Sequence, residues 1–557
     1  MLKKLAITIA GAVSLGSYEA GVLFEVLDAI RQHNDNPATS PDDKVVIDVI
    51  TGASAGGMTA VILAQKLLYS AQEFQGAYDN PLYNTWVKRI SLSGLQSPEE
   101  NESALQSLFS SNLIDAISRE LVQQRYTSSP MPPATPHSAV RDRLRVGLAL
   151  TNLNGVAYGY PVTPVGKFVY IDYSDQLTRE VVATTCDKED FWEPLRRSAV
   201  ACGAFPIAFR TQDLQRSAKA EPDDYTSENL EPWPGDPTTF TYSDGGILQN
   251  QPLGMAKNLV DLIDCHKDQE GRFYLFVSPH AKDPEANDSF HAANADYIHL
   301  VRRLIETVVG QSGFRDWITA KGVNQRIALL DARAAGLKDA ILHKKIDVAA
   351  LAKTSQSILD LFFPNGKHLS PGATKSESLA DAQGRVAQQY KQEMAALASD
   401  SVQAIAFRDA VLAFETAAGL GARDYMTIYG VIAEESELAG AGLQAFIGFF
   451  DQRFRDHDYD VGRTHAQQIL TDPTLSEPGA LGPLRFMPSA VRPIDSRLDG
   501  LRLKDVPSAD LKAFKTGTRK RLNQMLQEIW GPFIALPAEP VADLILDSAL
   551  NYLIAKM

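Results

Sequence analysis

The chain has 557 residues, of which 45% are hydrophobic and 22% are charged, a composition typical of a globular protein with a large core. Its formal net charge of −14 argues against a nucleic-acid partner and against docking on anionic lipid by charge alone, so any peripheral membrane contact would be local and apolar. The three cysteines include no C-x-x-C pair, so we expect neither a disulfide framework nor a zinc site, and a cytoplasmic location fits them.

The first elements expected along the chain are a strand, a loop and a helix. Residues 5–10 are apolar, residues 11–16 read GAVSLG, and apolar side chains then recur at helical spacing up to about residue 33. Two lysines before an apolar run also begin a signal peptide, but the helical stripe favours the strand–loop–helix interpretation. No run reaches the about 18 apolar residues that a membrane span needs.

The next segment repeats this alternation. VVIDVI at residues 45–50 is almost entirely apolar, as a parallel strand covered on both faces should be. GGMTAVILAQKLL at residues 56–68 is apolar almost all round and predicts a buried helix. We therefore expect an α/β fold with a mostly parallel central sheet.

Between this strand and this helix lies the pattern G-x-S-x-G. Ser54 thus stands at a strand-to-helix turn, which is the context of a nucleophile elbow. Gly52 and Gly56 would let the turn close tightly, and the helix N-terminus would favour an oxyanion beside the serine. The alternative is a serine in a glycine-rich turn with no catalytic role.

A nucleophilic serine needs a base. Among the ten histidines, His280 is the best placed, just past an expected strand. Asp244 is the stronger candidate, because it ends a β-rich stretch and Gly245 and Gly246 let the chain turn away from it. If its strand runs parallel to that of Ser54, both side chains face one crevice. A strand-to-helix turn with a capping acid is the alternative.

The third motif is the loop GAVSLG. Gly11 and Gly16 frame a loop that opens a helix, so its backbone N–H groups can be aimed at an anion. Val13 breaks the dinucleotide fingerprint, and the lysine and hydroxyl of a Walker A loop are absent from the motif. An oxyanion hole is the remaining chemical use, and a loop that is glycine-rich for packing alone is the alternative.

In this order, the three motifs resemble the patatin-like phospholipase family, whose members are lipid acyl hydrolases with a Ser–Asp dyad. RRSAVACGAFPIAF at residues 196–209 is also similar to the family, as is LALTNLNG, where Asn152 stands in the place of an aspartate. The resemblance spans residues 4–285. It implies a three-layer α/β domain, with Ser54 as the nucleophile and Asp244 as the base.

The glycine loop departs from the family pattern. The family usually reads G-G-G-x-R/K-G, whereas here Ala12 and Val13 replace glycines and Leu15 replaces the basic residue. Backbone donors need no particular side chain, so we still expect an oxyanion hole, while selectivity for phospholipids is less supported. Its expected residues are Gly11, Ala12, Val13, Ser14, Gly16 and Ala55.

The implied reaction is cleavage of a lipid or other carboxylic ester through an acyl-enzyme, like that of a phospholipase A or lysophospholipase. It requires no metal and no cofactor. Because a carboxylate is a weak base unless it is desolvated, we predict a raised pKa for Asp244. A non-catalytic lipid-binding or scaffolding module, which keeps the fold, is the other interpretation.

Two C-terminal segments invite other functions. FRDHDYDVG places Asp456, Asp458 and Asp460 at alternate positions, as a calcium loop does, but the glycine and glutamate of that template are missing. A charged, solvated segment is the expectation there. Residues 541–557 predict a strongly apolar helix for core packing, a subunit contact or membrane contact.

The expected domain division follows from these patterns. Residues 1–288 form the patatin-like domain, with a helical insertion at about 95–140. Residues 211–239 are a long polar insertion, expected as a surface loop. RFYLFVSP, at residues 272–279, is expected as the last core strand, and residues 289–557 as a mostly helical domain.

Overall fold

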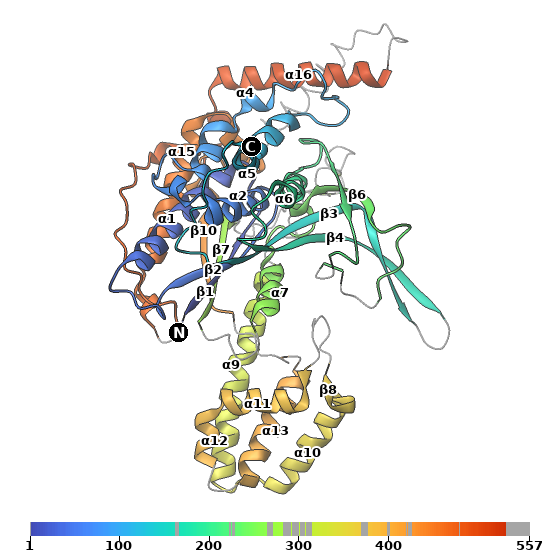
Figure 1. The fold of residues 1–557 in the computed structure, drawn as a ribbon, viewed down its shortest axis with the longest axis vertical. Coiled ribbons are helices and arrows are strands. Elements are labelled where there is room, and N and C mark those ends of the chain that lie inside the picture. The colour runs from blue at the N-terminus through green and yellow to red at the C-terminus, as the bar shows by residue number, and fades with distance from the viewer. Residues whose placement is uncertain are drawn as a thin grey trace. The chain divides into compact units, whose positions relative to one another are not determined.

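A computed structural model of the chain (Figure 1) describes residues 2–161, 166–221, 224–225, 229–264, 271–281, 291, 300, 307, 315–368, 377–397, 401–418, 420, 426–477 and 479–530. The strands are β1 Lys3–Ile9, β2 Val45–Gly52, β3 Arg143–Pro161, β4 Lys167–Val182, β5 Gln212–Arg216, β6 Thr238–Asp244, β7 Arg272–Ala281, β8 Lys367–His368, β9 Glu377–Ser378 and β10 Ile428–Glu434. The α-helices are α1 Gly16–Asp35, α2 Ala55–Tyr69, α3 Pro81–Tyr83, α4 Leu92–Leu95, α5 Ser111–Thr127, α6 Glu189–Cys202, α7 Leu253–Ile263, α9 Arg315–Leu342, α10 Val348–Phe362, α11 Leu379–Gln389, α12 Lys391–Leu397, α13 Ser401–Ala417, α14 Gly442–Ala445, α15 Gln452–Leu470 and α16 Ser508–Trp530. Short 3₁₀ turns include η1 Val13–Leu15 and η4 Gly245–Ile247.

The central sheet has eight strands in the described part of the chain. Its order is β10–β7–β1–β2–β3–β6–β5, and β4 also pairs with β3. The pairs from β10 to β3 are parallel, whereas β4, β5 and β6 join by antiparallel pairing. The expected α/β class with a mostly parallel central sheet is thereby confirmed.

Helices cover both faces of this sheet. Gly147 and Ala149 of β3 face α7, where Met255 packs against them. The intervening β3 residues, such as Leu148, join the main apolar core to which α1, α2 and α15 also contribute. Because successive strand residues point to opposite faces, β3 separates two helical layers. The expected three-layer arrangement is therefore present around the site.

The chain divides into two compact units, and the division differs from the expected boundary at residue 288. The first unit comprises the described residues of Met1–Val260, Gly271–Arg315 and Ile428–Met557. It includes β10, which pairs in parallel with β7, so the expectation that residues 272–279 form the last core strand is wrong. The reason is that the seven residues of β10 lie between helical segments, where periodicity gives little sign of a sheet partner.

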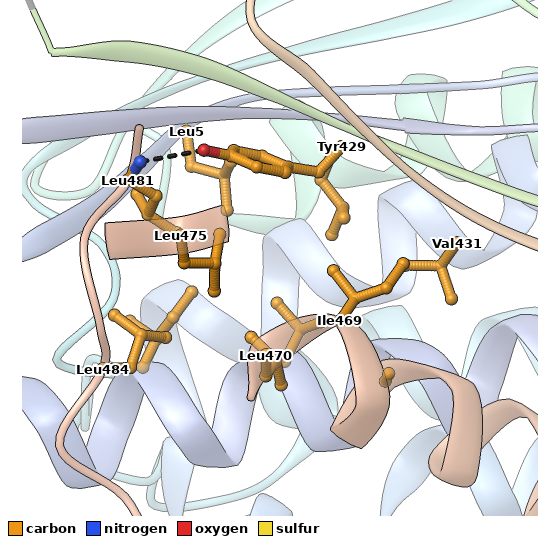
Figure 2. A pocket seen from close by; sticks show the side chains of 12 residues that line it. Leu5, Tyr429, Val431, Ile469, Leu470, Leu475, Leu481 and Leu484 are labelled. Atoms are coloured by element: carbon orange, nitrogen blue, oxygen red, sulfur yellow. Dashed lines mark hydrogen bonds between the residues drawn. The ribbon is translucent and has the colours of Figure 1, made fainter. Parts of the chain in front are cut away.

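The residues after β10 close one side of the first unit. Figure 2 shows a wholly apolar pocket lined by residues of β1, β7, β10, α1 and α15 together with the segment that follows α15. Tyr429 of β10 accepts a hydrogen bond from the Leu481 N–H at 2.8 Å, which fixes that segment beside the sheet. The labelled lining residues are Leu5, Tyr429, Val431, Ile469, Leu470, Leu475, Leu481 and Leu484.

The second unit contains the described residues of Asp261–Glu270 and Asp316–Thr427. Helices α9, α10, α11 and α13 share an apolar core in which Leu359, Phe407 and Val411 are fully buried. Arg385 and Glu415 form an ion pair inside this unit. It is helical apart from the two-residue strands β8 and β9, as expected for this part of the sequence.

Two smaller expectations can also be compared with the structure. The expected insertion at about 95–140 contains the helix α5. The polar segment 211–239 is not only a loop, because β5 at its beginning pairs with β6. The expected apolar helix at 541–557 lies outside the described residues. Among the helices that the structure describes, none combines the length and apolarity needed to cross a membrane.

Candidate active site

The nucleophile turn, residues 52–57, joins β2 to α2. Ser54 has φ 52° and ψ −126°, a left-handed backbone that is rare outside glycine and often marks a functional site. A side-chain carbon added at Gly52 would lie 2.3 Å from the carbonyl oxygen of Gly56. A carbon added at Gly56 would lie 2.4 Å from that of Ala10. The two motif glycines are therefore required by close backbone approach.

Asp244 lies at the end of β6, directly opposite this turn. The Ser54 hydroxyl donates a hydrogen bond of 2.6 Å to Asp244 Oδ2. The Gly246 N–H donates to the other carboxylate oxygen at 2.7 Å, which holds the carboxylate plane. The structure thus brings together two residues 190 positions apart, with no imidazole between them.

The way these strands meet differs from the expectation. We expected the two side chains to share a crevice because their strands would be parallel, but β6 is antiparallel to β3. β3 pairs with β2 at Leu148–Gly52 and with β6 at Leu150–Asp244. Because β4 occupies the opposite edge of β3 at both levels, β2 and β6 lie one after the other along the same edge, and their C-terminal ends meet there.

Burial sets the electrostatics of this pair. Asp244 is 1% exposed and Ser54 8% exposed. Burial raises the pKa of Asp244 to about 7, against the opposing effect of the hydrogen bonds from Ser54 and Gly246. The predicted upward shift is confirmed. Near neutral pH the carboxyl group can therefore both accept and return a proton.

The glycine loop, residues 11–16, lies beside the nucleophile turn and contains η1. The Gly11 N–H already donates to the Asn250 carbonyl oxygen at 3.0 Å, so Gly11 is not an available oxyanion donor, contrary to expectation. Val13 has φ 51°, which turns the loop sharply before α1 begins. The Gly16 N–H donates to the Ser14 carbonyl oxygen, so Gly16 is not an available donor either, and Ala12, Val13 and Ser14 remain the loop candidates for oxyanion donors.

The N-terminus of α2 supplies the second set of donors. Ala55 is the first residue of α2, so its N–H needs no carbonyl within the helix, and the helix dipole favours an anion there. Asn250, six residues after Asp244, also belongs to the site. A carbon added at Gly11 or Gly246 would meet its Oδ1 at 2.0 Å or 2.6 Å.

Residues from the far end of the chain hold the glycine loop. The buried Ser14 hydroxyl donates to the Ala445 carbonyl oxygen at 2.5 Å. A carbon added at Gly448 would lie 2.5 Å from Ser14 Oγ, and one added at Gly440 would lie 3.0 Å from a Leu15 methyl carbon. Leu15 is completely buried in this contact, so it is a core residue where the family has a basic one.

Asp458 organises this C-terminal support, which we define as residues 438–463. Its carboxylate accepts hydrogen bonds from the backbone N–H groups of Ala439 and Gly440 at 2.7 and 2.9 Å. His457 Nδ1 lies 3.1 Å from Asp458 Oδ1, and Nε2 lies 2.9 Å from Asp499 Oδ1. Burial alone would lower the pKa of His457, but these carboxylates raise it above its ordinary value.

The C-terminal support is held against the glycine loop by the packing of α15 on α1, the helix that follows the loop. The two helices pack with almost no space between their backbones, since a carbon added at Gly21 would lie 2.0 Å from the carbonyl oxygen of Tyr459. One added at Gly462 would lie 2.2 Å from that of Tyr18. Sequence reasoning missed this support. Its only signal was a set of glycines far outside the motifs.

The acidic triplet 456–460 is structural. It lies on α15, where the carboxylates of Asp456 and Asp460 bond to Tyr83, Tyr78 and Arg492. Asp458 is fully buried, so the expected solvated segment is wrong. Helical geometry places Asp456 and Asp460 on one face, where both bond to Arg492, and Asp458 on the opposite face. Within the described residues no cluster of metal-ligating side chains is present.

Two further residues that the sequence analysis singled out are His280 and Asn152. His280 lies in β7, and its side chain falls outside the described part of the chain. Asn152, in the place of the family's aspartate, accepts hydrogen bonds from the N–H groups of Asn154 and Gly155, both at 3.0 Å. Its side-chain amide donates to Asp175 at 3.1 Å. Asn152 therefore stabilises the irregular stretch inside β3 where the register with β4 shifts, between Thr151 and Val156.

Comparison with known proteins relates part of this chain to another protein and to a family. A protein of Sinorhizobium fredii that is itself uncharacterized, y4iI, is 25% identical over 327 residues. The aligned part is 46% of this chain and 45% of that protein, so the chain spans less than half of its relative's length. The model of the family "Patatin-like phospholipase" matches residues 7–257, which include both motif serine and motif aspartate. Residues 7–257 are therefore a patatin-like phospholipase domain, as the resemblance indicated.

Proposed function

We propose that this protein is a serine-dependent lipid acyl hydrolase, with Ser54 as the nucleophile and Asp244 as the general base. The single observation that supports it most is the 2.6 Å hydrogen bond between their side chains at the end of two strands. The family match implies a lipid substrate and supports a hydrolase. A phospholipase A or lysophospholipase activity on carboxylic esters, at a cytoplasmic membrane surface, is the form we propose.

The first half-reaction forms an acyl-enzyme. As the Ser54 oxygen attacks the ester carbonyl carbon, its proton passes to Asp244 Oδ2 along the existing hydrogen bond. The carbonyl oxygen becomes an oxyanion, and N–H groups of the glycine loop and of Ala55 stabilise it, each by roughly 3 kcal/mol. The carbon–oxygen ester bond then breaks, and the leaving alcohol takes the proton from Asp244.

The second half-reaction restores the enzyme. Asp244 takes a proton from a water molecule, whose oxygen attacks the acyl carbon bound to Ser54. Collapse of the second oxyanion releases the carboxylic acid, and Ser54 recovers its proton. A base with a pKa of about 7 suits both directions of this transfer near neutral pH.

The deciding experiment compares the wild type with Ser54→Ala and Asp244→Ala on a short-chain chromogenic ester, followed by a panel of lipid esters. We expect each substitution to lower kcat by about 10³-fold or more. A stoichiometric burst of product in the wild type would show the acyl-enzyme. Equal, slow turnover by all three proteins would contradict the proposal and favour the non-catalytic lipid-binding alternative.

A further inference from the structure

The hairpin arm, formed by residues 153–161 of β3 and 167–173 of β4, exposes an unusual amount of apolar surface. The exposed large side chains are Leu153 (50%), Tyr160 (40%), Phe168 (61%), Val169 (48%), Ile171 (50%) and Tyr173 (46%). Isolated exposed apolar residues need no explanation, but contiguous ones mark interaction surfaces. The arm extends from the sheet on the side where β3 and β4 continue past the other strands (Figure 1).

Both faces of the arm carry exposed apolar side chains. On one face Tyr158 stacks on Tyr170, and Tyr160 pairs with Phe168 in the same row. On the opposite face, Val169 and Ile171 stand across from Gly159 and Ala157 and stay half exposed, although the Lys167–Glu231 ion pair lies over Gly159. Amphipathic aromatic rings such as tyrosine gather at the head-group level of a lipid layer, and the arm presents tyrosines on both of its faces.

The charge of the arm indicates which kind of lipid surface it would bind. Its described residues include only one cation, Lys167, and one anion, Asp172. Lys167 forms an ion pair with Glu231, so the arm offers no cationic excess to anionic lipid. Aromatic and aliphatic side chains without excess charge are the composition that settles in the interface of a neutral lipid layer.

The arm begins at the candidate active site. β3 passes Asp244 at Leu150, and the Thr151 hydroxyl donates to the Asp244 carbonyl oxygen at 2.7 Å. Ile207 follows by three residues Ala204, whose carbonyl oxygen accepts the Asp244 N–H at 3.0 Å, and it is 75% exposed with φ 70°, although a β-branched residue rarely takes that conformation. The Leu108 N–H holds it there at 2.8 Å through the Ile207 carbonyl, so backbone strain presents an apolar side chain beside the site.

We propose that the hairpin arm docks this protein on the interface of a lipid layer with zwitterionic head groups. The inference rests on the proposed function in one respect: docking would bring the catalytic edge of the sheet to an ester substrate. Docking itself needs neither Ser54 nor Asp244. Binding and hydrolysis can therefore be measured separately.

The test uses the full chain and flotation with vesicles of ether-linked phosphatidylcholine, which has no ester to cleave. The variant Val169→Asp/Ile171→Asp places charge on one face of the arm. Its matched control is Val402→Asp/Ile405→Asp, whose parent side chains on α13 are 58% and 47% exposed. We expect the arm variant to lower the vesicle partition coefficient about 100-fold and the control to change it less than about threefold.

Two further measurements keep the outcome interpretable. Hydrolysis of a short-chain soluble ester should be unchanged in both variants, which shows that the arm variant is folded. If that variant does not fold, Phe168→Trp replaces it, and vesicles should shift the added emission to shorter wavelength. Wild-type protein that stays with the soluble fraction, or an arm variant that floats as well as the control, overturns the inference.

The same experiment distinguishes lipid docking from self-association and from attraction to anionic lipid. If the arm instead mediates self-association, the arm variant should form a smaller particle than the wild type by light scattering, and neither protein should bind vesicles. That result would contradict lipid docking. Stronger flotation with phosphatidylglycerol than with phosphatidylcholine would contradict the choice of a neutral surface. A wild type that floats but hydrolyses no ester would overturn the proposed function and leave the docking inference standing.

Discussion

The nucleophile turn and the glycine loop lie side by side, but different parts of the chain hold them. The turn depends on the N-terminal strands: Gly52 closes on the Gly56 backbone, Gly56 closes on the Ala10 backbone at the end of β1, and β1 pairs with β2. The loop depends on the C-terminal support, since the Ser14 hydroxyl is bonded to Ala445, 431 residues away. One half of the site is thus encoded locally and the other half by a distant contact.

The conformations of the turn and of the loop are therefore fixed by different kinds of contact. The turn follows from backbone sterics, because no side chain fits at its glycines. The loop is held in a conformation that its own residues disfavour, since Val13 has φ 51°, and packing on Gly440 and Gly448 of the C-terminal support stabilises it there. Changes in the turn should therefore abolish the site, whereas changes in the support should loosen it by degrees.

The largest effect is expected from Gly56→Ala, which tests the local half of the comparison. The added carbon would lie 2.4 Å from the Ala10 carbonyl oxygen and 2.5 Å from that of Ile9, neither of which can move without breaking the sheet. We expect the free energy of unfolding to fall by about 3 kcal/mol or more, with no measurable ester hydrolysis. Urea denaturation and a chromogenic ester assay measure the two effects.

A matched substitution calibrates this result. A carbon added at Gly235 has its nearest neighbour at 3.8 Å, so Gly235→Ala should change the free energy of unfolding by less than about 0.5 kcal/mol. If Gly56→Ala behaves like this control, the turn is not fixed by backbone contact, and the proposed distinction between the two halves is wrong.

The next largest effect is expected from Asp244→Asn, which should lower the activity and raise the stability of the protein. Asp244→Asn keeps an acceptor for Gly246 and a polar group for Ser54 but removes the base, so kcat should fall about 10³-fold. The folded-state pKa of about 7 lies above the unfolded value, so ionised Asp244 destabilises the wild type above about pH 4. The penalty grows up to about pH 7 and reaches at most roughly 4 kcal/mol.

The variant should therefore be more stable than the wild type at pH 8, and the difference should vanish below about pH 4. Denaturant titrations at several pH values measure it. A variant less stable than the wild type at pH 8 would show that Asp244 is not held in the strained, desolvated state that its burial indicates.

The pH dependence of the wild type tests the same carboxylate without substitution. Only ionised Asp244 can accept the Ser54 proton, so kcat/KM should rise tenfold per pH unit below about pH 7 and level off above it. Steady-state rates between pH 5 and 9, with a buffer series of constant ionic strength, measure the profile. A midpoint near pH 4 would mean that the base is solvated during catalysis.

The sequence allowed much of the local half to be predicted and little of the distant half. Ser54, Asp244 and the β1–α1 and β2–α2 units were predictable because motif, periodicity and chain order all agreed there. The strand β10 and the support at Asp458 were not, because β10 pairs with β7, 154 residues earlier at Ile428–Tyr274, and the support contacts the glycine loop, 431 residues earlier at Ser14–Ala445. Even the contact between Ser54 and Asp244 was reached through a parallel-strand argument that the antiparallel β6 contradicts.

An intermediate effect is expected when the C-terminal support is weakened. Asp458→Ala removes the acceptor for two backbone N–H groups and a partner of His457, so the loop that packs on Gly440 should become mobile. Because misplaced oxyanion donors affect the transition state more than substrate binding, kcat should fall about 10- to 100-fold with KM nearly unchanged. Ser14→Ala should lower kcat about tenfold, from the loss of one buried hydrogen bond.

The control for this prediction lies on the same helix. Asp456 bonds to Tyr83 and Arg492 rather than to the loop, so Asp456→Ala should leave kcat within about threefold of the wild type. Equal losses in both variants would mean that general destabilisation of α15, and not loop positioning, lowers the rate. A fall in KM with constant kcat in Asp458→Ala would also contradict the positioning role.

The smallest effect on catalysis is expected at the apolar pocket of Figure 2, which belongs to the C-terminal region but not to the loop contact. Leu475 is 3% exposed and lines this pocket with Leu470, so Leu475→Ala should lower the free energy of unfolding by about 2 to 4 kcal/mol. Below the unfolding transition, kcat should stay within about twofold, because the support at Asp458 is untouched. Denaturation and steady-state rates on one preparation measure both quantities. A large fall in kcat would show that the whole C-terminal region, rather than its contact with Ser14, sets the geometry of the site.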